Sequence, residues 1–69
     1  MENDRWGRRI RAFRKLKRMQ QVEFSRKIGI STTTLSKIER GERIPSVELL
    51  MIIAQALAID IQELKGNGP

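Results

Sequence analysis

The sequence predicts an all-α fold, a compact five-helix bundle. Apolar residues recur three and four positions apart along most of the chain, which is the spacing of one face of a helix. Capping residues and glycines divide the chain into five such segments. No segment shows the sustained alternation of apolar and polar residues that is typical of a strand. We therefore expect helices and no sheet.

The first segment is predicted to be an amphipathic helix over about residues 5–18. Its apolar residues recur at helical spacing, at Trp6, Ile10, Phe13 and Leu16. The opposite face carries arginine and lysine. Asp4 precedes the segment, and we expect it to be the N-cap because an aspartate accepts hydrogen bonds from the first N–H groups of a helix.

Two short helices separated by a glycine are expected next. The second helix covers residues 21–28 and ends at Gly29, because glycine adopts the left-handed conformation of a tight helix end at little cost. Ser31 is a suitable N-cap for a third helix that continues to about Arg40. Gly41 then ends this helix.

The last third of the chain predicts two more helices. Ser46 can cap a fourth helix over residues 47–58. Asp60 and Glu63 have the spacing of a capping box, which would begin a final short helix through Leu64.

A length of 69 residues accommodates one domain, which we expect over residues 1–65, with a disordered tail over residues 66–69. A chain this short buries only about 60% of its unfolded surface, so its core is small. Self-association is the simplest way to supplement it.

The composition excludes several classes of function. There is no cysteine and no histidine, which removes disulfides, thiolate and imidazole metal ligands, and the commonest nucleophiles and bases. We therefore expect no enzyme, no cofactor and no metal. No apolar run approaches the roughly 20 residues of a membrane span, and the first residues do not form a secretion signal. These features predict a cytoplasmic, nucleoid-associated protein without a membrane partner.

Charge is distributed unevenly along the chain. Residues 1–45 hold 13 basic and 5 acidic side chains, a net charge of +8, whereas residues 46–69 hold 1 and 3, a net charge of −2. The basic part would attract a polyanion, and nucleic acid is the common one in the cytoplasm. Charge alone is equally compatible with a solvated basic surface.

The central segment meets the requirements of a helix-turn-helix, in which two helices cross steeply through a tight turn and the second projects into the major groove. The inward side of the first helix needs apolar residues and one small residue, the turn needs glycine and an apolar plug, and the second helix needs apolar docking residues. These positions are held by Phe24, Ser25, Ile28, Gly29, Ile30, Leu35 and Ile38.

Longer motifs surround this segment, namely Gly7–Arg14, Gln21, Gly29–Ser31, Leu35–Arg43, Pro45–Ser46 and Leu49–Leu50. On these motifs, the span from Trp6 to Leu64 resembles the XRE-type helix-turn-helix family, which includes the phage repressors and Cro. The resemblance implies a lambda-repressor-like bundle whose third helix enters the major groove of double-stranded DNA.

The resemblance also implies roles for single residues. Gln21 opens the second helix and should bond a DNA phosphate, aided by the positive end of the helix dipole. Thr32, Thr33 and Lys37 match the family's base-reading positions, where a threonine methyl can meet a thymine methyl and a lysine can reach guanine acceptors. Ser31 is expected to be a cap first and a reader second.

Four further residues are expected to contact DNA outside the base edges. Thr34 and Ser36 should touch the sugar-phosphate backbone. Arg40 and Arg43 flank the loop after the third helix and should reach a phosphate or the minor groove, although loop arginines also serve as solubilising groups.

Arg14 and Glu39 match the family's internal ion pair, which would tie the first helix to the end of the third. Three positions depart from the family pattern. Arg18 and Ala58 stand where glycine usually ends the first and fourth helices, and Gln20 replaces the usual serine or threonine cap of the second helix.

The fourth helix is apolar nearly all the way round, and one helix of a small bundle cannot hide every face. We infer a partner surface that includes Met51, Ile52, Ile61 and Leu64, and the simplest partner is a second copy in a two-fold homodimer. The alternative is that this helix lies at the centre of the bundle.

These observations predict a sequence-specific transcriptional regulator, a repressor or an autoregulator, that binds a near-palindromic operator as a homodimer. The alternatives are a protein-binding module and a non-specific DNA-coating protein with the same fold. The sequence leaves open the operator, the sign of regulation, any contact with RNA polymerase or a toxin, and the choice between a phage repressor, a restriction-modification controller, an antitoxin and a fragment of a longer regulator.

Overall fold

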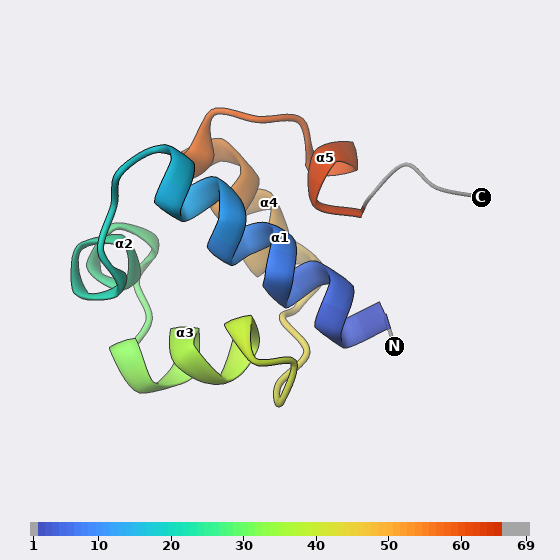
Figure 1. The fold of residues 1–69 in the computed structure, drawn as a ribbon, viewed down its shortest axis with the longest axis horizontal. Helices are drawn as coiled ribbons and strands as arrows, with labels where there is room; N and C mark the ends of the chain where they lie inside the picture. The colour runs from blue at the N-terminus through green and yellow to red at the C-terminus, as the bar shows by residue number, and fades with distance from the viewer. Residues whose placement is uncertain (1, 66–69) are drawn as a thin grey trace.

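Five helices follow one another in the computed structural model, which describes residues 2–65, with the backbone alone for residues 2–5 (Figure 1). They are α1 (Glu2–Leu16), α2 (Gln21–Ile28), α3 (Thr32–Glu39), α4 (Val47–Leu57) and α5 (Ile61–Lys65). Residues 2–65 contain no strand, so the predicted all-α, five-helix fold is confirmed. The expected disordered tail lies outside the described residues.

The core lies where α1 and α4 meet the other three helices. α1 packs against α3, α4 and α5, while α2 packs against α3 and α4 (Figure 1). The largest fully buried side chains come from all five helices and are Ile10, Phe24, Leu35, Ile38, Leu50, Ile53, Leu57 and Leu64. Arg9 adds a polar tether, since its Nη1 donates to the carbonyl of Glu63 at 3.1 Å and joins α1 to α5.

The inner face of α1 differs from the predicted one. The helix begins at Glu2, so Asp4 lies inside it and is not its N-cap. Leu16, expected in the core, is 72% exposed, whereas Arg14 is only 6% exposed. Arg14 takes the inner position because an acidic partner on α3 compensates its charge there.

Gly7 brings α1 very close to the end of α3. A Cβ atom at this position would lie 2.3 Å from the carbonyl oxygen of Ile38 and 2.6 Å from that of Glu39. Only a residue without a side chain allows this approach. The contact between α1 and α3 therefore depends on Gly7.

Four helices end in the same left-handed motif. In each, the N–H of the left-handed residue bonds the carbonyl three residues earlier, and the following N–H bonds the carbonyl five residues earlier. Gly29 and Gly41 adopt this conformation with φ of 81° and 79°. Arg18 and Ala58 adopt it too, with φ of 61° and 59°, so both departures from the family pattern hold a side chain in a strained backbone conformation.

The starts of α2 and α5 carry side-chain bonds to the first backbone N–H groups. At α2, the Oε1 of Glu23 accepts from the backbone N–H of Gln20 at 3.3 Å. At α5, Asp60 caps the helix by accepting from the backbone N–H of Gln62 at 2.9 Å, whereas Glu63 returns no bond from its side chain among the described residues. The capping box predicted for Asp60 and Glu63 is therefore incomplete.

No helix within residues 2–65 is long and apolar enough to cross a membrane.

Candidate nucleic-acid interface

The tight junction between α2 and α3 fixes where α3 begins. Gly29 ends α2 in the left-handed conformation, and Ser31 caps α3 by accepting from the backbone N–H of Thr34 at 3.0 Å. The Ser31 Oγ also donates to the hydroxyl of Thr34 at 2.9 Å. Ser31 and Thr34 thus bind each other, and the capping role expected for Ser31 is present.

The predicted base-reading residues of α3 differ in exposure. Thr33 and Lys37 are exposed, whereas Thr32 is half-buried, and its hydroxyl lies 3.1 Å from the Oγ of Ser25. The Ser25 hydroxyl has one proton and donates it to the carbonyl of Val22. The Thr32 hydroxyl is therefore the donor in its bond to the Ser25 Oγ. Thr32 therefore keeps only its methyl group and its lone pairs for another partner.

α3 is fixed to the body by residues on its inner side. Leu35 and Ile38 are buried in the core, as the sequence predicts, and Phe24 and Ile28 of α2 are buried with them. A docked helix loses little further entropy when its outer face binds a partner, which makes it a suitable platform for recognition.

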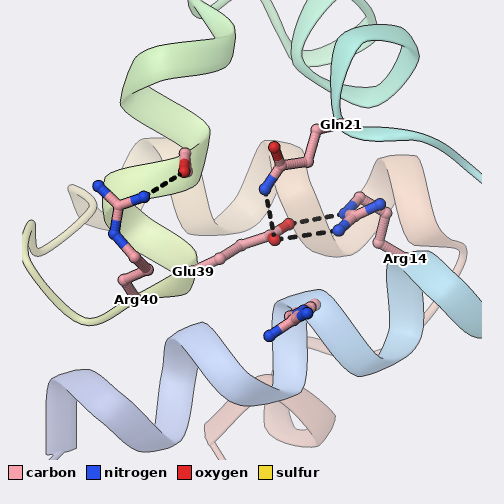
Figure 2. A pocket seen from close by; sticks show the side chains of 6 residues that line it. Arg14, Gln21, Glu39 and Arg40 are labelled. Atoms are coloured by element: carbon pink, nitrogen blue, oxygen red, sulfur yellow. Dashed lines mark hydrogen bonds and ion pairs between the residues drawn. The ribbon is translucent and has the colours of Figure 1, made fainter.

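Arg14 and Glu39 form a buried bidentate ion pair between α1 and α3 (Figure 2). Arg14 Nε and Nη2 donate to the two carboxylate oxygens at 2.7 and 3.1 Å, and Nη1 donates to the carbonyl of Met19 at 2.7 Å. Gln21 joins from α2, with its Nε2 donating to Glu39 Oε1 at 3.0 Å. One N–H of the Gln21 amide is thus committed to Glu39, and the other is left for the expected phosphate contact.

Arg40 at the end of α3 is held by exposed partners. Its Nε and Nη2 bond the Glu42 carboxylate at 2.8 and 3.2 Å, and its Nη1 donates to the Oγ of Ser36 at 2.7 Å. The hydrogen bond from Arg40 holds the pKa of Glu42 below its usual value, and the bond to Glu42 raises the pKa of Arg40. Arg43 lies on the exposed loop beyond this pair.

A notch lies between the N-terminus of α2, the middle of α1 and the end of α3 (Figure 2). It has a volume of about 350 Å³ and is lined by Arg11, Arg14, Gln21, Ser36, Glu39 and Arg40. The sequence predicted roles for five of these residues but did not single out Arg11. The only indication was the basic outer face of the first helix.

The apolar surface predicted for pairing is present on α4 but differs in extent. Met51 and Ile52 are 58% and 45% exposed. Ile61 is half-buried beside a shallow hollow of about 480 Å³. Leu64 is 0% exposed, because α5 turns it into the core, and this corrects its place in the predicted interface.

Two exposed apolar residues at the start of α4 and in the loop before it were missed by the sequence analysis. They are Ile44 and Val47, which are 67% and 66% exposed. Val47 lies one helical turn before Met51, so it extends the exposed side of α4 towards the loop after α3.

Comparison with known proteins places this arrangement in a family. The helix-turn-helix family model matches residues 10–64, which is most of the chain. The chain belongs to the XRE-type helix-turn-helix family. This XRE-type chain is therefore a DNA-binding transcriptional regulator by family.

Similar proteins agree with this assignment of the XRE-type chain. It is 50% identical over 64 residues to the uncharacterized transcriptional regulator YazB of Bacillus subtilis, covering 93% of each chain. The solved DNA-binding domain of the P22 C2 repressor superposes with a TM-score of 0.86 at 34% identity, covering 97% of this chain and 90% of that one. The restriction-modification controller C.AhdI of Aeromonas hydrophila superposes with a TM-score of 0.84 at 30% identity, covering 88% and 92%.

Proposed function

We propose that this protein is a sequence-specific repressor or autoregulator that binds a near-palindromic operator as a homodimer, with α3 in the major groove. The observation that carries the proposal is the outer side of α3, where Thr33 and Lys37 are exposed on a helix whose Leu35 and Ile38 are buried. Threonine and lysine can both read base edges in that groove. Bound there, the protein would regulate by excluding polymerase from the site or by contacting it.

Residues on α3 and next to it are suited to contact the DNA backbone. The remaining N–H of Gln21 and the exposed Arg43 lie on elements that flank α3, where DNA phosphates would pass. Thr34, Ser36 and Arg40 are bonded to other residues of the chain, so DNA contact there would share or replace those bonds. Thr32 would contribute its methyl group.

Pairing would place two copies of α3 in successive major grooves, about 34 Å apart. The proposed interface consists of Met51, Ile52 and Ile61, extended by Val47. The P22 C2 repressor domain and the C.AhdI controller, which share this fold, are named for regulatory roles of the kind proposed.

The test is selection of bound sites from a random duplex pool at physiological salt. We expect a two-fold symmetric consensus, and we expect Thr33→Ala and Lys37→Ala to relax preference at particular base positions while the unfolding temperature stays unchanged. Lys65→Gln on α5 is a charge-matched control for Lys37→Ala that should leave the consensus intact. An unenriched pool with steep salt dependence would instead identify non-specific coating, and unchanged binding by both α3 variants would point to a protein-binding role.

A further inference from the structure

We propose that the Arg40–Glu42 ion pair is an autoinhibitory contact, which a DNA duplex must open when it binds. In the free protein, the Glu42 carboxylate occupies the place on the Arg40 guanidinium that a backbone phosphate would take. This inference rests on the proposed function and goes beyond it, because it gives Glu42 a role that opposes binding.

Glu42 is turned back onto the last turn of α3 by the left-handed glycine before it. Gly41 has a φ of 79°, and the backbone N–H of Glu42 donates to the carbonyl of Lys37 at 2.8 Å. The carboxylate therefore lies beside Arg40, at the end of the proposed reading helix. The hydrogen bond from Arg40 and, to a smaller degree, the charge of Lys37 hold the pKa of Glu42 below its usual value.

The Arg40 guanidinium holds this carboxylate in the way that it would hold a phosphate. Its Nε and Nη2 donate to the two oxygens of Glu42 at 2.8 and 3.2 Å, and its Nη1 donates to the Oγ of Ser36. Carboxylates and phosphates both bind arginine through two parallel N–H groups. Because one pair of N–H groups cannot serve both anions, a phosphate bound there must displace Glu42.

The Arg40–Glu42 pair can open without damage to the fold. The two side chains are 56% and 53% exposed, and an exposed ion pair contributes little to stability because solvent screens it. The Arg14–Glu39 pair differs, with side chains that are 7% and 2% exposed, so opening it would strand a buried charge. Arg40 is therefore free to exchange one anion for another.

Glu42 also stands among cations that attract any duplex. A hollow of about 480 Å³ is lined by Arg8, Arg11, Glu39, Arg40 and Glu42, and of its two acids Glu39 is buried whereas Glu42 is exposed. Exposed cations attract DNA without regard to its sequence. An exposed carboxylate among them lowers this attraction, so Glu42 should weaken binding to specific and non-specific DNA alike.

The experiment is a double-mutant cycle on the full chain, measured on a selected duplex and on a random duplex of equal length. The proteins are the wild type, Glu42→Gln, Arg40→Gln and the variant with both changes. We expect Glu42→Gln to tighten binding about two- to fivefold on both duplexes. The base preference of the wild type should be retained, since phosphates carry no base information. In the Arg40→Gln background the gain should be smaller, because no ion pair is left to open.

Glu63→Gln is the matched control, because it removes one exposed carboxylate from α5, which packs against α1 and α4. If it tightens binding as much as Glu42→Gln does, or if the Glu42→Gln gain is the same without Arg40, Glu42 acts only through its charge and the proposal is overturned. Unchanged or weaker binding by Glu42→Gln overturns it too, since Glu42 would then not compete with the phosphate. Unfolding curves of all variants verify that the fold is intact.

The same measurements separate this proposal from the proposed function. A wild type that binds both duplexes equally overturns sequence-specific recognition. The proposal for Glu42 still stands in that case if the gain from Glu42→Gln depends on Arg40. A wild type that prefers the selected duplex, together with no coupling between the two residues, overturns the proposal for Glu42 alone.

Discussion

Glu39 is the residue at which three helices are joined. It lies at the end of α3, and its carboxylate accepts from Arg14 of α1 and Gln21 of α2. Both oxygens of this carboxylate accept hydrogen bonds inside the protein. A buried charge of this kind orients its neighbours only as long as every partner is present.

Loss of one member of this buried pair should be severe. We expect Arg14→Met to lower the free energy of unfolding by about 3 to 5 kcal/mol, because Glu39 would keep a buried, uncompensated charge. Denaturant unfolding measures the change. Removing the exposed partner of the other ion pair, by Glu42→Gln, should leave the unfolding midpoint where it is. A small effect of Arg14→Met would show that the carboxylate finds solvent or another partner.

At the scale of the element, the ends of the helices and their close approach decide the stability of the bundle. Two left-handed ends carry Arg18 and Ala58, where glycine would be unstrained. One contact between helices, at Gly7, has no room for a methyl group. Replacing Arg18 or Ala58 by glycine should therefore stabilise the chain, whereas replacing Gly7 by any other residue should destabilise it.

Ala58→Gly should raise the free energy of unfolding by about 1 kcal/mol, because it relieves the left-handed strain at the end of α4. In a domain of this size that corresponds to a rise of about 4–8 °C in the melting temperature. Ala12→Gly, at an exposed position inside α1, is the control of opposite sign, with a loss of about 1 kcal/mol. A decrease for both variants would mean that the backbone at Ala58 is relaxed.

Gly7→Ala should destabilise the protein by about 2 to 3 kcal/mol, although alanine is the better helix former. The added methyl group would meet two backbone carbonyls at the end of α3, which cannot rotate away as a side chain could. Thermal unfolding measures the loss, and Arg8→Ala at the exposed neighbouring position should have little effect. A stabilised Gly7→Ala variant would show that α1 can move away from α3 at low cost.

At the scale of the whole molecule, most of the positive charge and the exposed apolar side of α4 lie on different helices. The net positive charge lies in residues 1–45, which include α1, α2 and α3. The exposed apolar side chains Val47, Met51 and Ile52 lie on α4, in the acidic part. This division suits a molecule that binds DNA with one surface and a second copy of itself with the other.

Pairing through α4 predicts a stability that depends on concentration. The melting temperature of the wild type should rise with protein concentration in the micromolar range, because the dimer forms only from folded chains. Met51→Glu should abolish that rise and yield a monomer in sedimentation. Leu16→Glu, an equal change at an exposed apolar residue on α1, is the control. A wild type that is monomeric both free and on DNA would contradict the proposed interface.

The sequence alone was sufficient for the features that depend on near neighbours in the chain. The four inner helix boundaries near Gly29, Ser31, Gly41 and Ser46 follow from capping chemistry that acts over a few residues. The family resemblance added the partner of Arg14, 25 positions away, which no local pattern specifies.

The tertiary structure decided which side of each helix is covered, because burial depends on the elements that pack against it and not on the residue alone. Leu16 and Leu64 are both leucines at helical spacing, yet the first is exposed and the second is enclosed by α1 and α4. The same packing engages the hydroxyl of Thr32 with Ser25 and brings Arg14 and Gln21 to the carboxylate of Glu39. Local chemistry thus determines where each helix begins and ends, whereas surfaces and notches form only when distant segments of the chain pack together.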